Sequence, residues 1–193
     1  MTTEELYDKL KLIQKMKCET QNLELKSAER GCPKRLYDSL SSFSNQDDGG
    51  IIVFGIDEKQ DYKEVGVYDA QDIQKKINEQ CLQMNPVVQS LITVVEKENK
   101  KFVSAEIPGI DLADRPCYYQ GRGRLKGSYT RIGDSDEPMT EYEIYSYEAY
   151  RRKYQDDIRE VPRVTLMSLD QEELNRYVEL LKRGKQRLAT LDN

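Results

Sequence analysis

Four acidic residues lie beside two segments with the pattern of β-strands. Glu19 precedes and Glu24 lies within a segment of alternating polar and apolar residues. Asp57 and Glu58 follow a separate apolar run. If these strands are neighbours, three or four carboxylates converge. Oxygen-rich clusters bind Mg²⁺ or Mn²⁺, and such ions activate water for phosphodiester cleavage. The alternative is that these side chains are solvated, as we expect for most of the 35 acidic residues.

A basic stretch is the second candidate, because residues 115–131 hold five cations, three tyrosines and no acid. Glycines let a backbone approach phosphates, arginines pair with phosphates, and tyrosines stack on bases. These residue types predict a nucleic-acid site, and its candidate contacts are Arg115, Arg122, Arg124, Lys126, Tyr129 and Arg131. The alternative is a mobile hairpin whose arginines meet surface acids.

Composition excludes several other chemistries. The chain has no histidine, which rules out imidazole bases and Ser-His-Asp triads. Its four cysteines form no CxxC pair, so structural zinc is not expected, and scattered free thiols suit a reducing cytoplasm. There is no P-loop motif and no apolar run long enough for a membrane span. The net charge of −5 means that any anion site must be a local patch.

These residues need a sheet to position them, and its centre is predicted within residues 43–58. A polar loop ending in Gly49-Gly50 leads directly into four consecutive apolar residues, 51–54. Such a run favours a strand buried on both faces. The segment 22–27 alternates instead, which predicts a short strand with one solvated face.

Helices and further strands are predicted around this centre. Thr2 or Thr3 can cap a helix over residues 2–17, and Asp69 can cap the next but one. Pro33 and Pro138 suit the first turns of two others. The remaining predicted strands are 65–67, 87–96, 101–107, 118–119 and 128–132. The prediction is an α/β (α+β) fold with a mixed sheet and flanking helices in residues 1–154, followed by a linker and a final helix in 155–193.

Taken together, the motifs resemble the Schlafen-type, Alba-like DNA-binding domain over about residues 15–150. The matching patterns are E-x4-E-L-K from Glu19, S-F-S-N from Ser42 through Gly50, I-x-F-G-I-D-E from Ile52, and Y-x-R-I-G from Tyr129. This sequence departs from the family at Ser44, where alanine is usual. It also has Glu58 where aspartate is common.

The resemblance implies an α/β fold with a mixed sheet and an N-terminal place in a bacterial transcriptional regulator or ATP-binding protein. Further C-terminal domains usually follow in that family. In animal members the domain can act as a metal-dependent endonuclease on RNA. Its three acids correspond to Glu19, Glu24 and Glu58. For such a nuclease in this chain we expect Asp57 to assist as a metal ligand and Lys26 to hold the scissile phosphate.

Three functions follow as expectations. The first is a DNA- or RNA-binding module that uses the basic stretch together with Lys26. The second is a Mg²⁺- or Mn²⁺-dependent nuclease that uses the acidic trio. The third is a protein-interaction or oligomerisation module, for which a homodimer is an option. No membrane partner is expected.

Overall fold

The computed structural model describes residues 1–156 and 170–184, and the chain divides into two compact units, Met1–Tyr154 and Gln155–Asn193. The first unit contains a four-stranded sheet in the order β1-β2-β7-β6, formed by β1 (Leu23–Lys26), β2 (Gly50–Phe54), β7 (Lys100–Ile107) and β6 (Leu91–Lys97). Only β1 and β2 run parallel, and the other two pairings are antiparallel. The predicted mixed sheet is therefore confirmed.

Strand β2 lies in the interior of this sheet, between β1 and β7. Ile52, Val53 and Phe54 have no exposed surface. Alternate residues of a strand point to opposite faces, so an apolar run of this kind needs cover on both sides. The prediction of a central strand buried on both faces is confirmed.

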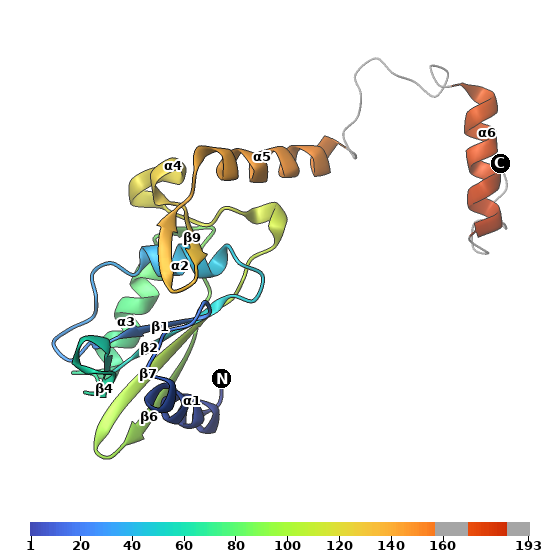
Figure 1. The fold of residues 1–193 in the computed structure, drawn as a ribbon. Coiled ribbons are helices and arrows are strands. Elements are labelled where there is room, and N and C mark those ends of the chain that lie inside the picture. The colour runs from blue at the N-terminus through green and yellow to red at the C-terminus, as the bar shows by residue number, and fades with distance from the viewer. Residues whose placement is uncertain (157–169, 185–193) are drawn as a thin grey trace. The chain divides into compact units, whose positions relative to one another are not determined.

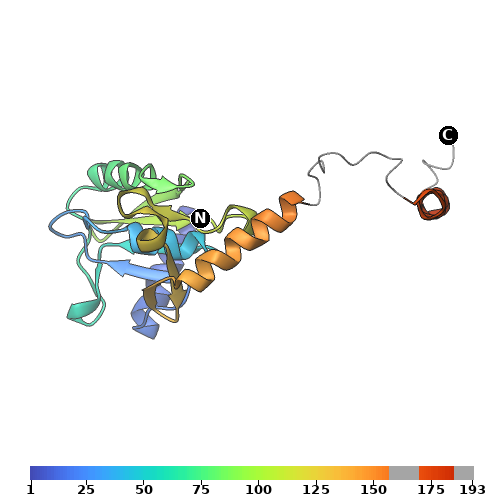
Figure 2. The same cartoon turned by 90° about the horizontal axis from the view of Figure 1, so that it is seen from above.

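Three helices cover the two faces of the sheet (Figures 1 and 2). Helix α1 (Thr3–Met16) packs on one face, where Leu6 and Leu10 share a core cluster with Val53. Helices α2 (Tyr37–Ser44) and α3 (Ala70–Cys81) pack on the opposite face. Two hydrophobic cores result, one on each side of the sheet.

Capping residues mark the starts of these helices better than the positions of prolines do. Thr2 forms a capping box with Glu5 at α1, and Asp69 accepts two backbone N–H groups at α3, as predicted. The predicted starts at Pro33 and Pro138 are wrong. Helix α2 begins only at Tyr37, and Pro138 lies in β10. Proline tolerates a first helical turn but does not create one.

Short elements complete the first unit. Strand β3 (Ile56–Asp57) pairs with β4 (Lys63–Glu64), β5 (Met84–Asn85) pairs with β8 (Tyr118–Tyr119), and β9 (Tyr129–Ile132) pairs with β10 (Ser135–Pro138). The 3-10 turns are η1 (Glu58–Gln60), η2 (Leu112–Asp114) and η3 (Gln120–Arg122), and the remaining helices are α4 (Gly123–Gly127) and α5 (Glu141–Asp156). The returning strand is thus 63–64 rather than 65–67, and the glycine-rich segment between β8 and β9 forms η3 and α4.

Helix α6 (Gln171–Gly184) belongs to the second unit and confirms the start of the predicted final helix. The rest of the predicted linker and helix end, 157–169 and 185–193, lies outside the described residues.

The Gly49-Gly50 turn is determined by backbone packing. Gly49 has φ +63°, a left-handed conformation that costs other residues energy. A Cβ atom at Gly49 would lie 2.8 Å from the Gly109 nitrogen and even closer to the Ile107 carbonyl oxygen. A Cβ atom at Gly50 would overlap the ring of Phe43. The glycine pair therefore lets the chain pass from α2 into β2 in close contact with its neighbours.

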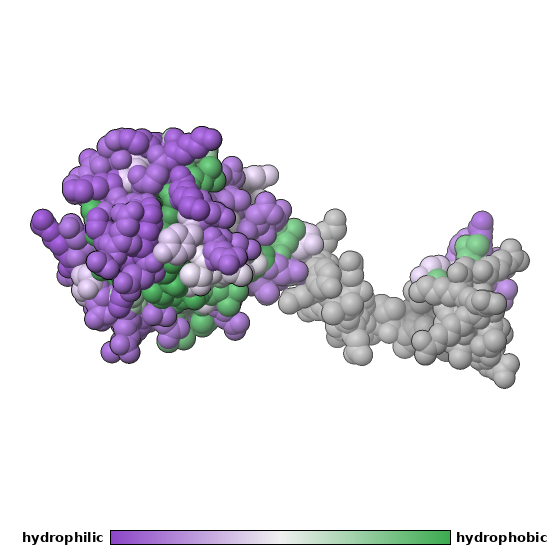
Figure 3. Space-filling view, turned by 90° about the horizontal axis from the view of Figure 1, so that it is seen from below, coloured by the Kyte–Doolittle hydropathy of each residue, from purple (hydrophilic) through white to green (hydrophobic). Residues whose placement is uncertain are grey.

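The side of the molecule shown in Figure 3 is mainly hydrophilic and also carries a band of hydrophobic side chains. None of the described helices is both long enough and apolar enough to cross a membrane.

Candidate functional site

Helix α2 holds the basic stretch in place through two buried polar side chains. Asn45, just after the helix, donates to the carbonyl oxygens of Cys117 and Tyr129, 3.0 Å each, and accepts from the Cys117 N–H at 2.7 Å. Ser41 donates to the Cys117 carbonyl at 2.7 Å and accepts from the Tyr129 N–H at 2.8 Å. These bonds attach β9 and the start of β8 to α2. The residues between them, 118–128, are thereby held at both ends.

Arg131 in β9 is the centre of a buried ion network. Its guanidinium donates to Glu24 at 2.8 Å and Asp136 at 2.9 Å, and also to the Leu23 carbonyl oxygen at 3.1 Å. Its side chain is only 1% exposed. Asp136 also accepts from the hydroxyls of two α2 serines, at 2.6 Å each. Arg131 thus links β1, β10 and α2, and this structure gives it a structural role rather than a free surface for phosphate.

Glu24 overturns the expectation of a solvated face on the first strand. The residue is 7% exposed, and its two carboxylate oxygens accept from Arg131 and from Lys26. A buried carboxylate is tolerated when it is paired in this way. A strand of alternating polar and apolar residues has a solvated face only where no other element covers that face. Here the β9–β10 hairpin covers the polar face of β1 and supplies the cation, Arg131.

Glu24 and Glu58 of the expected acidic trio both act electrostatically on Glu19. Burial, together with the charges of Glu24 and Glu58, raises the pKa of Glu19 to about 7. The Leu25 N–H donates to the Glu19 carboxylate at 2.6 Å, and this hydrogen bond lowers the pKa in part. Glu58 lies exposed in η1, and Asp57 precedes it, accepting from the Lys59 N–H at 3.1 Å. The carboxylates are therefore close enough to interact electrostatically.

In this structure Glu19 and Glu24 are engaged by other groups, and the described acidic side chains are not arranged to hold a metal ion. Both carboxylate oxygens of Glu24 already accept hydrogen bonds from cationic groups. One carboxylate oxygen of Glu19 accepts a hydrogen bond from a backbone N–H. Over residues 1–156 and 170–184, no three acidic or thiol side chains are grouped so that they could hold a metal ion.

The cations of the basic stretch divide into two kinds. Arg122 and Lys126 are exposed, and Arg124 is half exposed in an ion pair with Glu148 of α5. Arg115, by contrast, is 6% exposed and is held by Asp47 at 2.7 Å and by the Ile110 carbonyl oxygen at 3.1 Å. These contacts hold the loop around Arg115 in place. The segment 120–127, by contrast, presents its cations to solvent.

The glycines of this segment serve packing. A Cβ atom at Gly121 would lie 2.6 Å from the ring of Tyr119, and one at Gly127 would lie 2.5 Å from the Tyr119 carbonyl oxygen. Both glycines therefore allow the chain to fold closely around Tyr119. Tyr129 is 2% exposed, and its hydroxyl accepts from Arg122 at 3.1 Å.

Arg35 and Tyr37 join this site although the sequence analysis did not select them. The Tyr37 ring stacks on Tyr119, with centroids 4.5 Å apart and planes 12° from parallel. The guanidinium carbons of Arg35 and Arg122 each lie 5.3 Å from the Tyr37 ring centroid. Arg35 and Arg122 lie far apart in the sequence, so no local pattern indicated that they would meet. The one local signal was the pair of adjacent cations Lys34 and Arg35.

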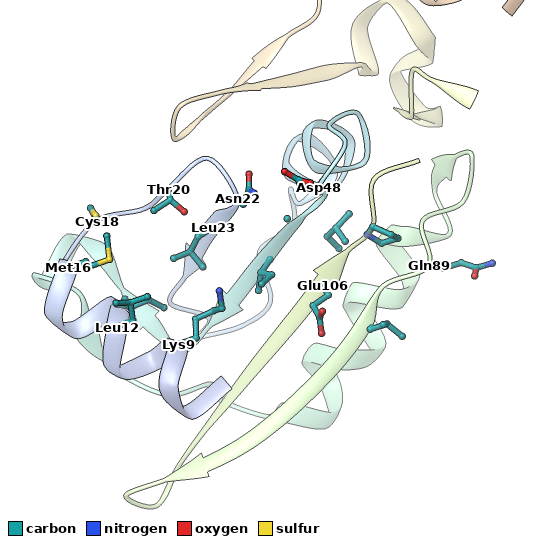
Figure 4. A pocket seen from close by; sticks show the side chains of 16 residues that line it. Lys9, Leu12, Met16, Cys18, Thr20, Asn22, Leu23, Asp48, Gln89 and Glu106 are labelled. Atoms are coloured by element: carbon teal, nitrogen blue, oxygen red, sulfur yellow. The ribbon is translucent and has the colours of Figure 1, made fainter. Parts of the chain in front are cut away.

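A cavity of about 450 Å³ lies elsewhere, between α1 and the sheet (Figure 4). Its walls include Leu12, Met16 and Leu91, with Lys9 and Glu106 among the polar members. None of the acidic or basic residues that the sequence analysis selected as candidate site residues lines it. The predicted nucleic-acid site and this cavity are therefore separate features.

Comparison with known proteins supports the motif analysis. A family model described as Schlafen, AlbA_2 matches residues 19–140, which is more than half of the 193 residues. No curated protein matches the chain.

Two solved structures resemble this one. The first is the N-terminal domain of a RecG-related protein from Nitrosomonas europaea, described as a candidate ATP-dependent DNA helicase, with 25% identity and a TM-score of 0.52 over 72% of this chain and 94% of that chain. The second is the DIP2311 protein from Corynebacterium diphtheriae, with 16% identity and a TM-score of 0.48 over 77% of this chain and 29% of that chain. On the family match, the chain belongs to the Schlafen, AlbA_2 family.

Proposed function

We propose that this domain binds nucleic acid through the segment 120–127. The observation that carries the proposal is the convergence of Arg122 with Arg35 at the Tyr37 ring, with Lys126 exposed in the same segment. Phosphates attract cations, and the guanidinium group pairs with phosphate through two parallel hydrogen bonds. Membership of the Schlafen, AlbA_2 family and the resemblance to a domain of a helicase-related protein support a function connected with nucleic acids.

The local charge distribution supports the same site. The chain as a whole carries −5, so it repels a polyanion except where cations gather. Residues 115–131 hold no acid, and among the described residues no carboxylate forms an ion pair with Arg122. Arg122 is therefore available to a phosphate without first breaking a salt bridge.

Fluorescence anisotropy with labelled DNA and RNA oligonucleotides tests the proposal. Replacing Arg122, Arg124 and Lys126 together by alanine is expected to abolish binding at moderate salt. Because each lost phosphate contact changes the salt dependence, the slope of log K against log salt should fall in magnitude by about 2. Binding unchanged from wild type refutes the proposal.

The matched control removes the same charge elsewhere. Lys11, Lys63 and Lys75 are exposed and lie outside the segment 120–127, so their joint replacement by alanine also changes the net charge by three. An equal loss of binding in this control would show a diffuse charge effect and not a site.

A metal-dependent nuclease that uses Glu19, Glu24 and Glu58 is the alternative proposal, because the charges of Glu24 and Glu58 act on Glu19. The ion pairs of Glu24 count against it in this conformation. Cleavage assays on structured RNA and single-stranded DNA with Mn²⁺ test this proposal, with Glu58→Gln as the variant because Glu58 is exposed. Absence of cleavage, or full activity in that variant, rejects the acidic trio as catalytic.

The finer expectations stay predictions. They include DNA as the preferred polymer, a role in transcriptional regulation, ATP binding by further domains, a homodimer, and a cytoplasmic location. Competition between DNA and RNA of equal sequence in the anisotropy assay would settle the first of these.

A further inference from the structure

Three tyrosines from two distant segments form a compact aromatic group beside the cations of segment 120–127. Tyr37 stacks on Tyr119, and its ring also lies 5.9 Å from the ring of Tyr129 at a tilt of 52°. Tyr129 is buried, whereas Tyr37 and Tyr119 are partly exposed. Gly121 packs so closely on Tyr119 that even one added carbon would overlap its ring. The arrangement of the rings is therefore set by close packing within the fold.

Two guanidinium groups lie over the same ring. Arg35 and Arg122 each approach Tyr37 to 5.3 Å, and both are exposed. Arg35 pairs with Asp38 at 2.8 Å, whereas Arg122 donates to the neutral Tyr129 hydroxyl at 3.1 Å and pairs with no carboxylate of residues 1–156 or 170–184. Two like charges at one aromatic ring repel each other, and a bound anion relieves that repulsion. The cluster thus combines aromatic rings with the positive charge of Arg122, which pairs with no carboxylate of the described residues.

We infer that this cluster, Arg35-Tyr37-Tyr119-Arg122, is a stacking site for one unpaired nucleobase, with the arginines pairing the adjoining phosphates. The inference rests on the proposed function and adds the class of ligand, which is single-stranded nucleic acid. Aromatic rings and guanidinium planes both stack on bases, and a base must be unpaired and turned outward to reach them. A duplex offers phosphates to the arginines but no free base face to the stack.

An abasic oligonucleotide separates the two contributions, because it keeps every phosphate and has no bases. Wild-type protein is expected to bind a dT 12-mer about 5- to 150-fold more tightly than an abasic 12-mer of equal charge, the range for stacking of one base. Tyr37→Leu should bring the ratio of the dT 12-mer affinity to the abasic 12-mer affinity close to one. Leucine keeps an apolar side chain of similar bulk, and circular dichroism verifies the fold.

Further variants sharpen the reading. Tyr37→Phe should bind like wild type, because the ring is kept. Tyr68→Leu is the control, since Tyr68 is 44% exposed and lies outside the cluster. Arg122→Gln should weaken binding of both oligonucleotides.

The outcomes distinguish this inference from the proposed function. Equal affinity for the dT and abasic 12-mers, or a Tyr37→Leu variant that binds the dT 12-mer like wild type, overturns the stacking site while salt-sensitive binding still supports the proposed function. If neither the dT 12-mer nor the abasic 12-mer binds, both the stacking site and the proposed function are overturned.

Discussion

Replacing Glu19 by glutamine is expected to stabilise the folded domain at neutral pH and to leave its stability nearly unchanged in acid. The carboxyl group is partly buried near Glu24 and Glu58, and its pKa is raised from 4.5 to about 7. Because the folded state holds this proton more tightly than the unfolded state, wild-type stability must fall as the pH rises from 4.5 to 7. Glutamine removes the charge, and its side-chain oxygen can still accept from the Leu25 N–H.

The size of the effect follows from the shift. A raise from 4.5 to about 7 corresponds to an upper limit of about 3 kcal/mol at 1.36 kcal/mol for each pKa unit. The carboxyl group keeps contact with solvent, which screens its interactions, so we expect about 1–2 kcal/mol. With a urea m-value of about 2 kcal/mol/M, the unfolding midpoint should move by roughly 0.5–1 M.

Urea unfolding followed by circular dichroism at several pH values between 4.5 and 8 measures this difference. The gap between Glu19→Gln and wild type should widen up to about pH 7 and then stay constant. Glu29→Gln, at an exposed position, is the control and should follow wild type throughout. A gap of equal size at every pH would show that the substitution acts through packing, and the electrostatic explanation would be refuted.

Three further substitutions probe the framework of the site, all measured as urea unfolding free energies. Arg131→Gln leaves Glu24 and Asp136 without their shared cation, and should cost about 3–5 kcal/mol; a loss below 1 kcal/mol would contradict a buried ion network. Asn45→Asp removes the amide donors to two buried carbonyl oxygens and should cost at least about 2 kcal/mol at pH 7, with wild-type stability as the refuting result. Gly49→Ala adds a carbon against the neighbouring backbone at φ +63°. It should cost at least about 2 kcal/mol, and wild-type stability would show that the turn opens to make room for the carbon.

Local sequence determined much of the framework. Hydrophobic spacing predicts α1 and α3 with their capping residues Thr2 and Asp69, since periodicity and caps act within a few residues. Four consecutive apolar residues predict the interior strand β2, because only a strand covered on both faces buries them all. The motifs around Glu19 and Arg131 identify the family.

Only the tertiary structure decided which of the selected side chains are free to act. Arg131 and Arg122 look alike in the sequence, yet one is closed in an ion network with Glu24 and the other is exposed beside Tyr37. Their fates depend on partners about 85 to 107 positions away in the chain, beyond the range of local patterns. For the same reason Arg35 and Tyr37 gained their place in the site only when α2 packed against β9: a charge or ring acquires its function from the groups that folding brings beside it.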